Sequence, residues 1–280
     1  MSFLSFSPCC VKGGILPGVP RGDYDTSTLK KVGGYHVNSS DGMIGDGKVA
    51  LVIFADIFGL QVPNCQILAD GFSDELKCHV FVPDYIPNPP PNSAFTQVAK
   101  TFPEEYANRP WYISLIEWIK TIFKAWKWIP TFLFQGNQIR LAQAAVDNLI
   151  TEGYTTIMSI GYCRGATILE YLLSSSSNVI QCAVLCHPEP KPRLYNHINR
   201  PTIWNIPDHD TFFKSNEVDI LKRIMGKKVK DQGLEFECFV HKDTVHGFAN
   251  RPTLDHEATK IAFEKVNNDA IEFFKRHLLQ

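Results

Sequence analysis

The chain has 280 residues, of which 44% are hydrophobic and 20% are charged, and its formal net charge is −1. This length is sufficient for one large globular domain. The near-neutral charge argues against a general nucleic-acid or anionic-membrane binder, because both need a basic excess.

Apolar runs alternate with helical patterns along the chain, which predicts an α/β fold. Residues 1–34 are rich in glycine and proline, so we expect an irregular N-terminal segment there. Strands are expected at 48–55, 79–83, 156–160, 179–186, 202–206 and 235–241, and helices at about 62–75, 137–152, 168–173 and 257–278. The alternation implies a mostly parallel central sheet with helices on both faces, within a single domain over residues 1–280.

An aromatic-rich stretch at 105–135 does not fit this alternation. It contains Trp111, Trp118, Trp126 and Trp128, but lysines at 120, 124 and 127 interrupt it, so it is no transmembrane span. We expect a helical insert that either packs on the core or caps the active site. An amphipathic helix lying on a membrane is the less favoured reading.

The most informative motif is Gly161-Tyr162-Cys163-Arg164-Gly165, between the strand at 156–160 and a helical pattern. It matches the nucleophile elbow of an α/β-hydrolase with cysteine in place of serine. The turn is tight, so the positions two before and two after the nucleophile need glycine. The alternative is a buried, inert cysteine in a strand–turn–helix connection.

An acid and a histidine follow the elbow in the α/β-hydrolase order. Asp208 and Asp210 both follow the strand at 202–206, and we favour Asp210 as the acid. Among the histidines we favour His246, since it lies in a loop before Gly247 and after the acid-bearing strand. His187 is its one serious rival, because it follows the strand at 179–186.

These motifs together resemble the dienelactone hydrolase (carboxymethylenebutenolidase) family. Two further matches are Ala55-Asp56-Ile57-Phe58-Gly59 and Val82-Pro83-Asp84, and the resemblance extends from about residue 9 to 278. The opening Cys9-Cys10 looks like the eukaryotic, particularly fungal, branch. A vicinal disulfide or a metal contact at this pair is less favoured than a plain N-terminal segment.

The resemblance implies hydrolysis of a lactone or ester through an acyl-enzyme. Cys163 would attack the carbonyl, His246 would handle the proton and Asp210 would orient the imidazole. The backbone N–H groups of Ile57 and Arg164 would hold the oxyanion. The side chains expected to bind substrate or modulate the thiol are Asp56, Phe58, Tyr85, Tyr162, Phe248 and Arg251; the acid at position 56 contacts the resting cysteine in the family.

The chain departs from the family in its anion clamp. Bacterial members grip a substrate carboxylate with two arginines, one in the loop after the strand ending near Asp84. Here that loop has Tyr85 and no arginine, and the position four after the histidine is Asn250, with Arg251 one place later. The loss of a bidentate arginine changes carboxylate recognition, so the triad chemistry is expected more firmly than the dienelactone substrate. The aromatic insert at 110–134 points to a larger or more apolar acyl or alcohol group.

The remaining predictions concern partners and location. There is no phosphate-binding glycine loop and no cluster of metal-ligand spacing, so we expect no cofactor and no metal. The N-terminus is a poor signal peptide, so we expect a cytoplasmic monomer or homodimer with free thiols, acting on a small-molecule lactone or ester. The alternative is a catalytically silent α/β-hydrolase scaffold that binds a partner.

Overall fold

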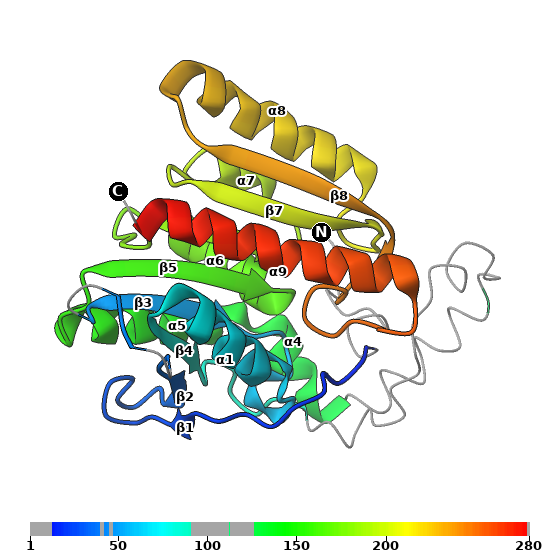
Figure 1. Ribbon diagram of the computed structural model, residues 1–280. Helices are drawn as coiled ribbons and strands as arrows, with labels where there is room; N and C mark the ends of the chain where they lie inside the picture. The colour runs from blue at the N-terminus through cyan, green and yellow to red at the C-terminus, as the bar shows by residue number, and fades with distance from the viewer. Residues whose placement is uncertain (1–12, 40–41, 45–46, 91–111, 113–125, 279–280) are drawn as a thin grey trace.

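The computed structural model describes residues 13–39, 42–44, 47–90, 112 and 126–278 (Figure 1). The Cys9-Cys10 pair and most of the aromatic stretch at 105–135 lie outside these ranges, so the predictions on them are not tested by it.

The centre of the fold is an eight-stranded sheet in the order β1-β2-β4-β3-β5-β6-β7-β8. Its strands are β1 (Asp23–Tyr24), β2 (Gly34–Val37), β3 (Val49–Phe54), β4 (His79–Pro83), β5 (Thr156–Tyr162), β6 (Cys182–Cys186), β7 (Thr202–His209) and β8 (Phe236–Val245). Pairing is parallel from β4 to β8, whereas β2 is antiparallel to both β1 and β4. The mostly parallel sheet is thus confirmed. The two-residue β1 lies in the segment that we expected to be irregular.

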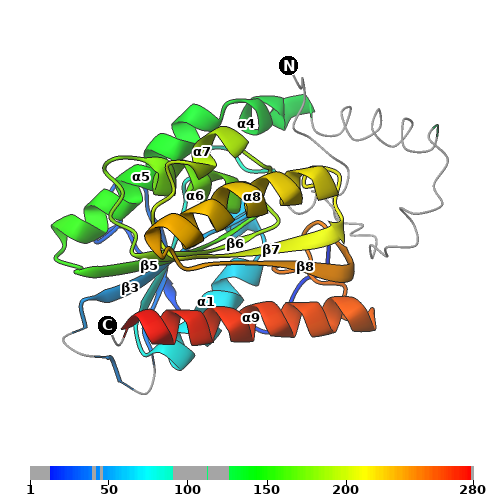
Figure 2. The same ribbon diagram turned by 90° about the horizontal axis from the view of Figure 1, so that it is seen from above.

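Helices cover both faces of the sheet (Figure 2). One face carries α1 (Asn64–Leu76) and α9 (Glu257–Leu278), and the other carries α5 (Gln135–Thr151), α6 (Arg164–Ser174) and α8 (Ser215–Gln232). The shorter elements are η2 (Gly59–Gln61), η4 (Trp126–Trp128), α4 (Ile129–Leu133) and α7 (Pro192–Tyr195). Helix α8 was not assigned from the sequence, although Val218, Leu221 and Met225 bury one side of it.

The alternation along β3 divides the core into two layers. Leu51 and Ile53 pack with the residues of α1 and α9. Val52 and Phe54 pack with those of α5, α6 and α8. Every one of these four side chains is fully buried. A strand buried on both faces reads as a continuous apolar run, which is why β3 was recognisable in the sequence.

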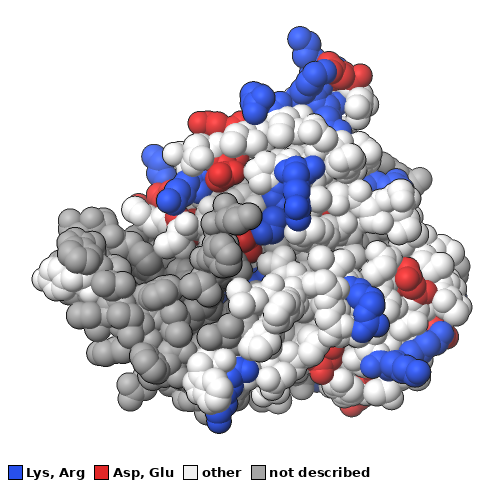
Figure 3. Space-filling model, turned by 180° about the vertical axis from the view of Figure 1, so that it is seen from behind, with Lys and Arg blue, Asp and Glu red and all other residues white. Residues whose placement is uncertain are grey.

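The surface carries charges of both signs. Basic and acidic side chains are interspersed over the face seen in Figure 3, in keeping with the formal net charge of −1. Among the residues described, no helix is long and apolar enough to cross a bilayer.

The parallel strands bring their carboxyl ends to one edge of the sheet. Phe54 lies opposite Gly161 in the register of β3 and β5, and Tyr162 lies opposite Cys186 in that of β5 and β6. Loops that follow these strands therefore leave the sheet side by side, at the edge where open α/β sheets bind ligands.

Candidate active site

The predicted elbow is a sharp turn between β5 and α6. Cys163 is its central residue, with φ 52° and ψ −114°, a backbone conformation that residues other than glycine rarely adopt. A Cβ atom on Gly165 would lie 1.9 Å from the carbonyl oxygen of Phe54, and one on Gly161 would lie 2.7 Å from the backbone nitrogen of Ala166. Both glycines are therefore required by the close approach of backbone, as the sequence predicted.

The backbone of Cys163 is held from both sides. Its N–H donates to the carbonyl of Cys186 at 3.0 Å, and its carbonyl accepts the Thr167 N–H at 3.0 Å and the Thr167 hydroxyl at 3.2 Å. Cys163 is 8% exposed and directly precedes α6. The positive end of the helix dipole favours a thiolate at this position.

The structure brings together Asp210 and His246, the predicted acid and histidine. His246 Nδ1 lies 2.9 Å from Asp210 Oδ2, and both side chains are almost completely buried. The second oxygen of Asp210 accepts the backbone N–H of Phe212 at 2.8 Å. Both carboxylate oxygens are therefore held, and one of them fixes the imidazole.

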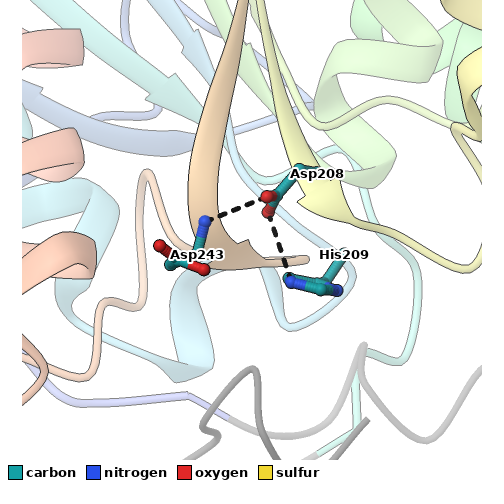
Figure 4. A group of neighbouring side chains, drawn as sticks. All are labelled: Asp208, His209 and Asp243. Atoms are coloured by element: carbon teal, nitrogen blue, oxygen red, sulfur yellow. Dashed lines mark hydrogen bonds and ion pairs between the residues drawn. The ribbon is translucent and has the colours of Figure 1, made fainter. Parts of the chain in front are cut away.

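Asp208, the other candidate acid, has a different position. Its carboxylate accepts the backbone N–H groups of Asp243 at 3.0 Å and Thr244 at 3.2 Å, which ties the end of β7 to β8. Side-chain atoms of Asp208, His209 and Asp243 lie within 4.8 Å of one another, close enough to share a cation (Figure 4). The two backbone N–H groups satisfy the Asp208 carboxylate without a bound cation. We therefore interpret Asp208 as a residue that links β7 to β8.

The charge of His246 depends on its neighbours. Burial alone would lower the pKa of this imidazole, but the charges of Asp210 and Cys163 outweigh it, and the hydrogen bond between His246 Nδ1 and Asp210 adds to their effect, so the pKa lies well above its usual value. Asp210 and Cys163 therefore both favour the charged form of His246.

His187, the rival histidine, lies against His246 rather than replacing it. The two rings are 4.8 Å apart between centroids and meet edge to face, and Phe212 contacts His246 in the same manner at 5.4 Å. Burial and the charge of His246 lower the pKa of His187 well below its usual range. His187 is therefore an uncharged neighbour that packs on the His246 ring.

A second buried ion pair lies beside the first. Asp56 Oδ2 accepts Arg251 Nε at 2.6 Å and Asn250 Nδ2 at 3.0 Å, and Asp56 Oδ1 accepts the Phe58 N–H at 3.0 Å. The Arg251 guanidinium also lies over the Phe58 ring, 4.9 Å from its centroid. The hydrogen bonds to Arg251 and Asn250 join Asp56 to the loop after His246. The family resemblance instead implies a contact between the acid at position 56 and the resting cysteine.

The remaining predicted residues lie around these pairs. Ile57 follows Asp56 in the loop after β3, and Arg164 is the first residue of α6, where N–H groups have no acceptor within the helix. The Tyr85 hydroxyl donates to the carbonyl of Ala55 at 2.5 Å. Tyr162 ends β5 with its side chain fully buried, and Phe248 is 1% exposed and packs between His187 and His241.

The described end of the aromatic stretch lies on the loop after β4. The Thr131 hydroxyl lies 3.2 Å from the carbonyls of both Pro87 and Asn88, and Gln138 Nε2 donates to the Thr131 carbonyl at 2.6 Å. Trp128 is partly buried and packs against the core layer that includes residues of α5 and α6. This part of the stretch is therefore at the same edge of the sheet as the candidate site.

A sequence profile of the dienelactone hydrolase family matches residues 120–278, more than half of the chain. The chain belongs to the dienelactone hydrolase family. This match includes the elbow, Asp210 and His246, and it supports a hydrolytic enzyme. A comparison with curated protein sequences found no significant match.

Solved structures confirm the α/β-hydrolase fold. A dienelactone hydrolase-like promiscuous phosphotriesterase from metagenomic libraries is 14% identical, with a TM-score of 0.58 over 91% of this chain and 96% of that one. A putative dienelactone hydrolase from Klebsiella pneumoniae is also 14% identical, with a TM-score of 0.58 over 83% and 90%. The apo form of Thermogutta terrifontis esterase 2 is 15% identical, with a TM-score of 0.55 over 92% and 96%.

Two neighbours of the site were not predicted from the sequence. Phe212 contacts His246, yet nothing distinguishes it from any aromatic residue after a strand. Asn64 is 1% exposed and binds the backbone of Asn250 at 2.7 Å, although it begins a helix far away in the sequence. Only its burial in the structure marks Asn64 as a neighbour of the site, and the burial of a single asparagine cannot be predicted from the sequence.

Proposed function

We propose that the protein hydrolyses a carboxylic ester or lactone with Cys163 as nucleophile, His246 as base and acid, and Asp210 as the residue that orients the imidazole. The observation that carries this proposal is the 2.9 Å contact between His246 Nδ1 and the buried Asp210 carboxylate, in a chain that holds Cys163 on a strained elbow. Acyl transfer requires a nucleophile, a base and a group that orients the base, and these three side chains would supply them.

The proposed reaction has two steps. In the first, the Cys163 thiolate attacks the carbonyl carbon, a C–S bond forms, and the C–O bond to the alcohol breaks as His246 gives that oxygen a proton. In the second, His246 takes a proton from water, the hydroxide attacks the thioester, and the C–S bond breaks to release the acid. The N–H groups of Ile57 and Arg164 would hold the oxyanion in both steps.

The test is a comparison of cysteine variants. Cys163→Ala is expected to abolish hydrolysis of a p-nitrophenyl acyl ester, with the fold retained by circular dichroism. Cys238→Ala, which changes a half-buried thiol on β8, is the control and is expected to keep full activity. Cys163→Ser should be far slower than the parent protein, because the site is arranged for a thiolate. Unchanged turnover by Cys163→Ala would end the assignment.

We further propose that the substrate is uncharged near the scissile bond. Arg251 is already paired with the buried Asp56, and Tyr85, in the loop where family members carry the other arginine, donates its hydroxyl to Ala55. The displaced Arg251, the Asn250 at the family's second clamp position and Tyr85 in the loop of the first are therefore all engaged in contacts within the protein. A carboxylate substrate would have to displace Asp56 from a charge-assisted hydrogen bond.

Turnover of a panel of aryl esters and lactones tests this preference. Neutral aryl esters are expected to have a higher kcat/KM than small anionic lactones of similar reactivity. Faster turnover of the anionic lactones would contradict the proposal. Absence of turnover on the whole panel by folded protein would instead favour the silent scaffold.

The organisation of the chain completes the proposal. We infer one catalytic domain over residues 1–280, in which the described residues 126–135 of the aromatic stretch border the site, since Thr131 contacts the loop after β4. The monomeric or homodimeric state and the cytoplasmic location stay predictions.

A further inference from the structure

Asn64 is a buried amide with every polar group in use. It is 1% exposed at the start of α1. Its Oδ1 accepts the Leu16 N–H at 3.1 Å, and its Nδ2 donates to the Gly14 carbonyl at 2.9 Å and to the Asn250 carbonyl at 2.7 Å. A buried amide is costly unless it is hydrogen-bonded, so this side chain fixes the distance between three segments that are remote in sequence.

The N-terminal segment at 13–16 fits closely against the loop that follows His246. The Gly14 N–H donates to the Arg251 carbonyl at 3.1 Å. A Cβ atom on Gly14 would lie 2.1 Å from the carbonyl oxygen of Pro252, and one on Gly13, which has φ +149°, would lie 2.7 Å from Arg251 Cβ. Only glycine permits this approach of the two backbones.

The contacts continue from Asn64 to both halves of the proposed reaction centre. The Arg251 N–H donates to the Gly247 carbonyl at 2.8 Å, which closes a turn directly after His246. Asn250, at the far end of that turn, donates from its side chain to Asp56, beside the proposed oxyanion donor Ile57. Asn64 thus holds the end of a turn whose other end carries the imidazole.

We propose that Asn64 is a positioning residue, which joins the segment at 13–16 to the loop after His246 and thereby fixes the imidazole and the Asp56 loop relative to Cys163. The inference rests on the proposed function, since it assigns these groups their catalytic roles. It gives the irregular N-terminal segment a part in the active site. A mutation far from the reacting atoms that misplaces catalytic groups by about 1 Å can lower the rate roughly 100-fold.

The decisive variant is Asn64→Asp, which keeps the size of the side chain but points a carboxylate oxygen at the carbonyls of Gly14 and Asn250. Asn216→Asp, at an exposed position of α8, is the matched control. We expect kcat for a p-nitrophenyl ester to fall roughly 10- to 100-fold with little change in KM. We also expect the pH dependence of Cys163 alkylation by iodoacetamide, followed by peptide mass spectrometry, to shift. An unchanged kcat and alkylation profile would overturn the proposal.

A second variant decides the matter if Asn64→Asp does not fold. Gly14→Ala places a methyl group against the Pro252 carbonyl, whereas Gly136→Ala, the control, meets nothing within 4 Å. Gly14→Ala is expected to lower kcat and shift the alkylation profile in the same direction, and parental values for both would refute the positioning role. The Cys163→Ala result separates the two proposals: an inactive Cys163→Ala with normal Asn64→Asp and Gly14→Ala refutes the positioning role alone.

Discussion

Two buried aspartates lie at this edge of the sheet, and each binds a basic side chain from the same loop. Asp210 holds His246, and Asp56 holds Arg251. The partners differ in one property: an imidazole gains and loses a proton near neutral pH, whereas a guanidinium stays charged. The first pair is therefore suited to proton transfer, and the second is a permanent tie between the loop after β3 and the loop after β8.

The surroundings of the two pairs follow this difference. The rings of His187 and Phe212 pack against His246, whereas the groups that raise the pKa of its imidazole are Asp210 and Cys163. Arg251 lies on Phe58 and shares its carboxylate with Asn250, an arrangement that satisfies a charge but offers no proton. Substitution of Asp210 and substitution of Asp56 are therefore expected to change two different properties of the protein.

The largest effect is expected on catalysis, from Asp210→Asn. The amide keeps the shape of the acid but no longer fixes the productive tautomer of His246 or stabilises its cation, so kcat should fall by roughly 10³- to 10⁴-fold. Ester hydrolysis measures this loss. Asp208→Asn, two residues away, is the control and should stay within a few-fold of the parent kcat; equal losses in both would contradict the assignment of the acid.

A stability effect is expected from Asp56→Asn. Removal of one partner leaves the buried Arg251 charge uncompensated, which costs about 3–5 kcal/mol in free energy of unfolding. Urea denaturation measures it, with Asp74→Asn as control, since the exposed Arg21–Asp74 pair is worth about 0–1 kcal/mol. A loss no larger than that of the control would show that Asp56 and Arg251 are not a buried tie.

A smaller effect is expected in the pH dependence of stability. The pKa of His246 is raised in the folded protein, so its stabilisation is complete below the unfolded value of about 6.5 and is lost as pH rises through the folded pKa. The free energy of unfolding of the parent should therefore fall across that window. Asp210→Asn should flatten the fall, and Asp56→Asn should not, because arginine does not titrate there. Identical slopes in all three proteins would contradict this account.

The elbow and the contact between Asp210 and His246 were largely predictable because their signals are local. The elbow needs two glycines at fixed spacing around Cys163, and Asp210 and His246 each follow an apolar strand in the expected order. Strands buried on both faces are continuous apolar runs, so the parallel part of the sheet was readable as well. Of the two aspartates, Asp210 is the one that contacts His246, and its role as the acid stays a prediction.

What could not be predicted depends on contacts between distant loops. The hydrogen bond from Arg251 to Asp56 spans 195 positions, and the one from Asn250 to Asp56 spans 194. No periodicity or turn signal reports such a pairing. The role of Asn64 is hidden for the same reason, and the short β1 is formed by pairing with β2 rather than by a local pattern.

The left-handed backbone at Cys163 sets folding and chemistry against each other. A residue other than glycine in such a sparsely populated backbone conformation lowers the free energy of unfolding by about 1–3 kcal/mol, and glycine would relieve that cost. The best residue for the durability of the chain at position 163 is therefore one that cannot react at all. The protein gives up part of its margin against denaturation to keep a sulfur atom at the tip of the turn.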